Sequence, residues 1–129
     1  MPEVIHSRQK RRVKDAVRLR DRRGREQQQR IIIDGVRELQ RAIDGGIELI
    51  EVYWCESLCA SEDARAVLAA TRAGPAALLG VSREVFGKIA FGDRAEGLIG
   101  VARTPQRTLA DLAPALPERP LIAVLEGVE

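Results

Sequence analysis

The stretch RIIIDGVRELQRAIDGG, residues 30–46, predicts a strand followed by a helix. Its first four residues are rich in β-branched side chains, which favour a strand. Asp34 is predicted to cap the helix, because its carboxylate can accept hydrogen bonds from N–H groups of the first turn. Val36, Leu39 and Ile43 then share one helical face, and the closing glycine pair ends the helix. The stretch therefore predicts one β/α unit.

Short β runs and helical runs alternate along the chain on the C-terminal side of this unit. Within the next strand, Ile47 and Leu49 are predicted to face inward, while Glu48 and Glu51 are predicted to face solvent. Ser82 is predicted to cap a later helix. The alternation predicts an α/β fold, with a sheet covered on both faces by helices. The predicted strands span residues 30–33, 47–54, 76–81 and 97–102, and the predicted helices, with their caps, span residues 34–46, 61–72 and 82–89.

The charge of the chain is distributed unevenly, although the formal net charge of the 129 residues is only +2. Residues 1–30 hold eleven Lys or Arg against four acidic residues, a net of +7. Residues 31–129 hold ten against fifteen, a net of −5. A basic arm on a mildly acidic body indicates a polyanionic partner. The alternative is a solvated helix whose charge has no specific partner.

The basic arm is predicted to form one helix, from an N-cap at Ser7 to a stop at Gly24. Val13, Ala16 and Val17 point to one side and are predicted to pack on the body. Arg20 interrupts that side, and its stem is expected to lie on the body while its head stays in water. Five cations share a sector of roughly 80° on the opposite side: Arg11, Lys14, Arg18, Arg22 and Arg25. Such a row of mostly arginine side chains suits phosphate contact better than base reading.

Aromatic residues are few: Tyr53, Trp54, Phe86 and Phe91. Recognition of RNA by base stacking needs aromatic side chains gathered on one surface, and this composition disfavours it. The sequence has no apolar stretch of membrane-spanning length and no signal-peptide pattern, so the expected location is the cytoplasm and no membrane partner is expected.

Other candidates for chemistry are weak. Cys55 and Cys59, with His6 as the single histidine, supply too few nitrogen and sulfur ligands for a closed zinc site within one chain, so reduced, inert thiols are expected. His6 is interpreted as a helix-start or RNA-facing residue. The loop 91–97 could shape an RNA-facing rim or act as a glycine-flanked connector. We assign no catalytic, cofactor-binding or metal-binding residue.

The end of the chain predicts a linker and then a new core strand. Residues 104–118 are proline-rich and contain one short helix around residues 109–112. Leu121 to Leu125 are continuously apolar, as in a strand buried on both faces, and Glu126-Gly127 begins a loop. Ligand chemistry in α/β proteins usually follows such a strand. The chain is therefore expected to be the front part of a longer protein.

Several short motifs, in order, resemble the N-terminal substrate-binding domain of SpoU/TrmH-type RNA ribose methyltransferases. They are Ile5-His6-Ser7, Val13-Lys14, Arg25, Ile31 to Gly35, Val81-Ser82, Val85-Phe86, Ala95-Glu96-Gly97 and Val101-Ala102. Leu125 to Glu129 resembles the opening of the first catalytic motif of the family. Lys10 differs, because such proteins often carry Asn there, and the knotted catalytic half is missing.

The resemblance implies a three-layer α/β/α sandwich like that of kink-turn RNA-binding ribosomal proteins, with Gly35 close to RNA at a helix start. It implies a parent enzyme that transfers a methyl group from S-adenosylmethionine to a ribose 2′-hydroxyl, in 23S ribosomal RNA, and that forms a homodimer through its catalytic half. The implied division is a basic arm (1–29), an RNA-binding domain (30–103), a linker (104–120) and the first strand of the catalytic domain (121–129). The chain alone is expected to be inactive and to bind no cofactor.

Two other functions stay open at this point. One is a stand-alone RNA-binding protein of the ribosomal kink-turn type, against which the linker and the extra apolar run argue. The other is a protein-interaction module whose basic arm binds an acidic partner.

Overall fold

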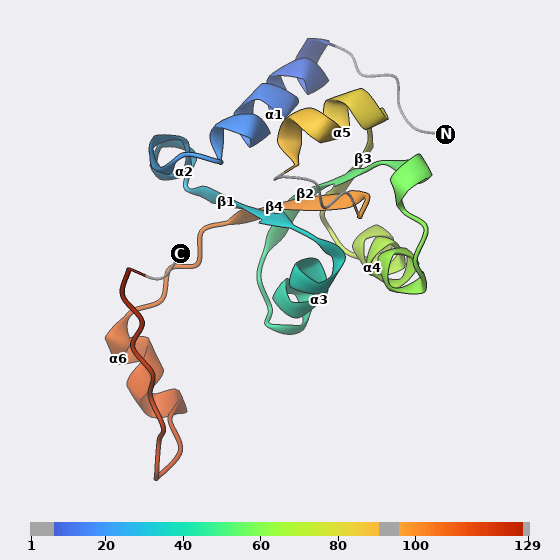
Figure 1. Ribbon diagram of the computed structural model, residues 1–129. Helices are drawn as coiled ribbons and strands as arrows, with labels where there is room; N and C mark the ends of the chain where they lie inside the picture. Colours follow the sequence, from blue (N-terminus) through green and yellow to red (C-terminus); the bar gives the residue numbers. More distant parts are fainter. Residues whose placement is uncertain (1–6, 91–95, 128–129) are drawn as a thin grey trace.

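A mixed sheet of four strands forms the centre of the computed structural model, which describes residues 7–90 and 96–127 (Figure 1). The central strand β4 is antiparallel to both neighbours, whereas β2 and β3 are parallel. One edge of the sheet therefore gathers the carboxyl ends of β1, β2 and β3 and the amino end of β4. The strands are β1 (Arg30–Asp34), β2 (Leu49–Trp54), β3 (Ala77–Gly80) and β4 (Leu98–Arg103), in the order β1-β4-β2-β3.

Helices cover both faces of this sheet, as the sequence predicts (Figure 1). On one face lie α1 (Ser7–Arg18) and α5 (Arg83–Ile89), and on the other lie α3 (Val36–Asp44) and α4 (Glu62–Ala73). The short α2 (Arg22–Gln28) leads from α1 into β1. The α/β prediction is confirmed, and so is the covering of both sheet faces by helices.

Each face of the sheet has its own core. On the α1–α5 face the largest buried side chains are Tyr53, Phe86 and Leu19. On the α3–α4 face Leu39 packs with Val52 and other aliphatic residues. The predicted cap by Ser82 forms, because its Oγ accepts from the Val85 N–H at 3.2 Å. Ser61 caps α4 in the same way, since its Oγ accepts from the Ala64 N–H at 3.0 Å.

The prediction of one continuous basic helix is wrong. The chain turns after Arg18, and the Asp21 carboxylate caps α2 by accepting from the Gly24 N–H at 2.7 Å. Gly24 lies buried inside α2, where an added Cβ would stand 1.9 Å from the Arg18 carbonyl oxygen. Glycine therefore acts here as the residue that lets two helices meet, not as a helix stop. The cap position before Ser7, and His6, lie outside the described residues.

The prediction that Glu51 faces solvent is also wrong. The register of β2 against β4 shifts between Leu49 and Glu51, which inserts an extra residue into β2. Because side chains alternate between the two faces of a strand, this bulge reverses the alternation. Leu49 stays with the α3–α4 core, while Glu51 is buried with only 6% of its surface exposed. Glu48 is exposed, as predicted, and pairs with Arg103 at 3.2 Å.

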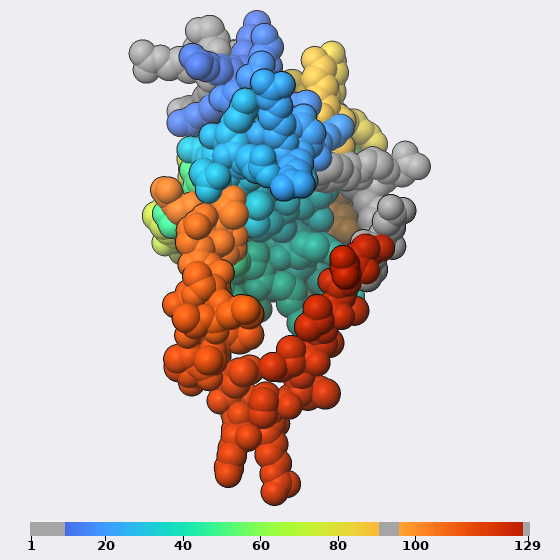
Figure 2. Space-filling model, turned by 90° about the vertical axis from the view of Figure 1, so that its left-hand side faces the viewer, coloured from blue at the N-terminus to red at the C-terminus, as the bar shows by residue number. Residues whose placement is uncertain are grey.

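Residues 104–127 leave the sheet and project from the body (Figures 1 and 2). The predicted short helix is present as α6 (Leu109–Leu112), capped by Thr108, and it continues into a 3₁₀ turn at Ala113–Ala115. The predicted strand at residues 121–125 does not form, since no other segment of the described residues pairs with it. Leu121 is 99% exposed and Leu125 is 79% exposed. Within residues 7–90 and 96–127, no helix has the length and apolar character to cross a membrane.

Candidate nucleic-acid interface

A groove between α1 and α5 combines an apolar floor with several cations. Half-buried Val13 and Val17 of α1 and Val85 of α5 line its apolar part, and they pack on the core beneath. Its volume is about 820 Å³. The lining residues in the described part of the chain include no carboxylate. Its rim consists of four exposed cations: Lys10, Lys14, Arg18 and Lys88.

The sequence prediction found part of this rim. Lys14 and Arg18 lie on it, whereas Arg11 is exposed on α1 outside the lining residues. Lys10 and Lys88 were missed. Lys10 could have been found, because it stands four residues before Lys14 and such residues are neighbours on a helix. Lys88 could not, because the docking of α5 beside α1 is a tertiary contact.

The remaining two predicted cations lie beyond the break in the helix. Arg22 is exposed on α2 and pairs with Glu26 at 2.7 Å; this hydrogen bond raises the pKa of the guanidinium. Arg25 is half-buried and donates to the carbonyl oxygens of Leu19 (3.0 Å) and Arg20 (2.9 Å). Arg25 thus stabilises the turn between α1 and α2.

Arg20 joins the two helices of the groove. Its Nε donates to the carbonyl oxygen of Ile89 at 3.2 Å, and its Nη2 donates to that of Ala90. Arg20 as a residue is exposed, and its head group also binds these backbone carbonyls, a contact that the sequence did not predict. The C-terminal turn of α5 offers unpaired carbonyls, and a cation there is favourable. This contact fixes the spacing of α1 and α5 and hence the groove.

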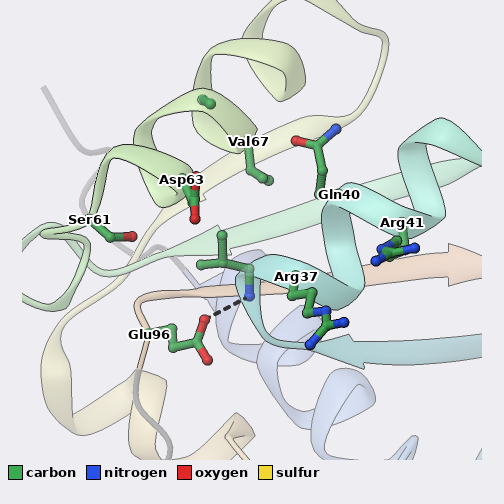
Figure 3. Close-up of a pocket in the computed structure, with 9 residues that line it drawn as sticks. Arg37, Gln40, Arg41, Ser61, Asp63, Val67 and Glu96 are labelled. Atoms are coloured by element: carbon green, nitrogen blue, oxygen red, sulfur yellow. Dashed lines mark hydrogen bonds between the residues drawn. The ribbon is translucent and has the colours of Figure 1, made fainter.

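A second candidate surface lies at the edge of the sheet where α3 begins. Gly35, the residue before α3, has φ +121°, which other residues rarely adopt. The predicted cap by Asp34 is wrong, because the position next to the helix belongs to Gly35, which has no side chain. Instead Glu96, 60 residues away in the sequence, accepts from the Val36 N–H at 3.1 Å (Figure 3). Neither residue type nor spacing could have indicated this contact.

The pocket beside that helix start has mixed charge. Its volume is about 280 Å³. Arg37 and Arg41 come from α3, and they share the pocket with Asp63 of α4 and with Glu96 (Figure 3). The positive end of α3 is thus already partly neutralised by a carboxylate. Residues 91–95 of the loop 91–97, for which both an RNA-facing rim and a simple connector stayed open, lie outside the described residues.

The other candidates for chemistry are buried or absent from both surfaces. Cys55 and Cys59 are free and buried, one in each core. Among the described residues, no cluster of three or more His, Cys, Asp or Glu is placed to hold a metal ion. Tyr53 and Phe86 are buried, and Trp54 is half-buried with the Arg72 guanidinium 5.4 Å from its ring centre.

Solved structures of RNA methyltransferases share this fold. The chain is similar to a crystal structure of an RNA 2′-O ribose methyltransferase, with 40% identity and a TM-score of 0.67 over 76% of this chain and 36% of that one. It is also similar in fold to the SpoU methyltransferase AviRb from Streptomyces viridochromogenes in complex with AdoMet, with 17% identity and a TM-score of 0.66 over 84% of this chain and 39% of that one. The chain thus spans little more than a third of these proteins.

The family follows from the sequence match. The profile of the MRM3-like substrate binding domain matches residues 10–100, so the chain belongs to this family of substrate-binding domains of SpoU/TrmH RNA 2′-O methyltransferases. The resemblance to the SpoU/TrmH substrate-binding domain is confirmed. No curated protein matches the chain in sequence.

Proposed function

We propose that this chain is the RNA-recognition part of an S-adenosylmethionine-dependent RNA 2′-O-ribose methyltransferase that acts on 23S ribosomal RNA in the cytoplasm. The observation that carries the proposal is the family match over residues 10–100, which spans the sheet and both helical layers almost completely. The cationic rim of the α1–α5 groove supports it, since phosphate contact supplies much of the affinity of proteins for RNA.

In this proposal the methyl-transfer chemistry belongs to a catalytic part beyond Glu129, which also binds S-adenosylmethionine and forms a homodimer. The chain then divides into an arm (1–29), an RNA-binding domain (30–103), a linker (104–120) and the first catalytic strand (121–129). The high exposure of Leu121 and Leu125 supports this division, because such side chains are normally buried against a neighbour.

The proposed phosphate contacts are Arg11, Lys14, Arg18 and Arg22, with Arg25 fixing the turn that holds Arg22 beside α1. Gly35 is proposed to lie near RNA, together with a proposed likeness of this domain to kink-turn RNA-binding proteins. There the backbone at the start of α3 would approach RNA, and Glu96 limits the positive potential available to phosphate.

Binding of the chain to 23S ribosomal RNA fragments tests the proposal. Fluorescence anisotropy over a series of salt concentrations should give a log–log slope of about −3 to −4 if four phosphates are contacted. The control is Arg65→Ala, which removes an exposed cation from α4 and should leave the slope unchanged. No binding at low salt would contradict the proposal. Binding of an acidic polypeptide in place of RNA would favour the protein-interaction alternative.

Calorimetry with S-adenosylmethionine tests the placement of the catalytic part. We expect no saturable binding to the 129-residue chain at micromolar ligand. Saturable binding would contradict the assignment of the cofactor site to residues beyond Glu129, whether or not RNA binds.

A further inference from the structure

We propose that the α1–α5 groove binds an unpaired stretch of RNA, with one base resting on the valine floor and its flanking phosphates held by the lysine and arginine rim. The inference rests on the proposed RNA-binding function and names the form of RNA that this surface takes. The groove floor is defined as Val13, Val17 and Val85, and the groove rim as Lys10, Lys14, Arg18 and Lys88.

The spacing of the groove rim suits a polyanionic strand. Lys10, Lys14 and Arg18 follow one another at four-residue intervals on α1, which places their backbones about 6 Å apart along the helix. Phosphates of a nucleic-acid strand recur every few ångströms, so neighbouring rim cations lie within reach of phosphates of the same strand. Lys88 stands across the groove on α5, so the rim provides cations on both sides of a bound strand.

The groove floor explains why the strand should be unpaired. Three branched aliphatic side chains are half-buried, and the core beneath holds them in place. A duplex keeps its bases stacked inside, where they cannot reach this floor, whereas an unpaired base can turn out and cover apolar surface. Valines lack the ring faces of a stacking platform, so the floor should accept any base and add little sequence preference.

An acidic amphipathic helix is the competing occupant, and the groove fits it less well. Such a helix inserts several apolar anchors spaced over two turns. The floor offers three valines, while four cations surround it. A surface with more cations than apolar side chains gains most of its binding from charge, as RNA binding does.

Paired variants test the rim. Lys88→Ala and Arg83→Ala both remove one exposed cation from α5, but only Lys88 lines the groove. With a single-stranded oligonucleotide from ribosomal RNA, Lys88→Ala should weaken binding severalfold and flatten the log–log salt slope by about 0.7. Arg83→Ala should change neither value. Equal effects of the two replacements would overturn the proposal.

A second pair tests the floor. Val85→Thr keeps the side-chain shape and adds a hydroxyl at the groove, whereas Val81→Thr makes the same change at a half-buried valine of the same core that lies outside the groove. Val85→Thr should weaken the binding of single-stranded RNA by about threefold and leave the binding of duplex RNA unchanged. Thermal unfolding of both variants checks that each is folded.

The outcomes separate this inference from the proposed function. Absence of RNA binding by the unaltered chain would contradict the function itself. RNA binding that Lys88→Ala and Val85→Thr leave unchanged would overturn the groove assignment alone. If Val85→Thr weakens the binding of duplex and single-stranded RNA equally, the inference of an unpaired strand is overturned. It is also overturned if an acidic amphipathic peptide binds more tightly than the RNA and loses this binding in Val85→Thr.

Discussion

The two helical layers on this sheet carry cations in different settings. In the α1–α5 layer, the groove rim surrounds an apolar floor and includes no carboxylate among the described lining residues. In the α3–α4 layer, Arg37 and Arg41 share a pocket with Asp63 and Glu96. In the first layer Arg18 is paired with Asp15 at 3.9 Å, while a phosphate there still meets Lys10, Lys14 and Lys88, for which no ion pair is found within residues 7–90 and 96–127. At the second layer a phosphate meets carboxylates in the pocket itself. The number of basic residues on a surface therefore matters less than the acids beside them.

The cores beneath the two layers also differ in the polar groups that they bury. On the α1–α5 side, the Tyr53 hydroxyl donates to buried Glu51 at 2.5 Å, and the Arg30 guanidinium lies 3.6 Å from the other oxygen of Glu51. Burial and this hydrogen bond raise the pKa of Tyr53 well above its usual range, so the phenol stays a donor. On the α3–α4 side the buried polar residue is Thr71, whose hydroxyl donates to the Val67 carbonyl of its own helix.

The largest effect is expected from breaking the buried polar cluster. Glu51→Ala leaves the Tyr53 hydroxyl and the partly exposed Arg30 without their carboxylate, and should lower the free energy of unfolding by about 3 kcal/mol. Urea unfolding measures the loss. Glu48→Ala is the matched control in the neighbouring sequence, where an exposed ion pair is worth at most about 1 kcal/mol. Equal unfolding midpoints for the two variants would show that Glu51 contributes no more than a surface carboxylate.

The next effect concerns RNA binding by the two layers. Lys14→Ala/Lys88→Ala removes two cations of the groove rim, and Arg37→Ala/Arg41→Ala removes two from the α3 pocket. The first pair of replacements should weaken the binding of single-stranded RNA by about tenfold and flatten the log–log salt slope of binding by about 1.4. The second should cost about threefold or less, because Asp63 and Glu96 line the same pocket and repel an incoming phosphate. A larger loss from the α3 pair would reverse the comparison and move the main RNA contact to the edge near Gly35.

Local patterns predicted most of the fold. The β-branched run at residues 30–33, the helical spacing after it and the cap by Ser82 each depend on neighbours in the sequence, and all three form. The arm prediction failed after Arg18, where the chain turns, because a continuous helical pattern does not reveal this turn. Nor does it reveal that Gly24 permits the close contact between α2 and the end of α1. The bulge in β2 was equally invisible, because one inserted residue reverses which side of the strand is buried.

The candidate site was harder to predict, because distant residues complete it. Lys14 and Arg18 were found from helical spacing, while Lys88 and Arg20 act through the docking of α5 on α1. Glu96 reaches α3 from 60 residues away, so Asp34 was the natural but wrong choice for the cap. The apolar run at residues 121–125 predicts a strand, yet a strand needs a pairing partner, and the described chain supplies none to it.

A smaller effect should follow from removing the remote cap of α3. Glu96→Ala leaves the Val36 N–H without its carboxylate acceptor and should cost about 1 kcal/mol, as loss of a helix cap usually does. Glu96→Gln keeps an acceptor oxygen and should recover part of the loss. Thermal unfolding measures both, with Glu62→Ala in the first turn of α4 as the control. Unchanged stability, together with unchanged amide exchange at Val36, would show that water replaces the carboxylate at no cost.

The smallest effect is expected on the opening of the two layers, which can be followed separately because each core contains one buried thiol. Cys55 lies in the α1–α5 core and Cys59 in the α3–α4 core. Burial raises the pKa of the Cys59 thiol, so its reactive thiolate should form at higher pH than in the unfolded chain. In a Cys55→Ala background, the labelling rate of Cys59 should therefore increase at a higher pH in the folded chain than in the chain unfolded by urea.

Cooperative units of a protein can open separately, each with its own free energy. Glu96→Ala should then speed labelling of Cys59 by about fivefold, which corresponds to 1 kcal/mol, and leave Cys55, measured in a Cys59→Ala background, nearly unchanged. Equal acceleration at both thiols would mean that the sheet and its two layers open as one unit, and the contrast between the layers would then be confined to their surfaces.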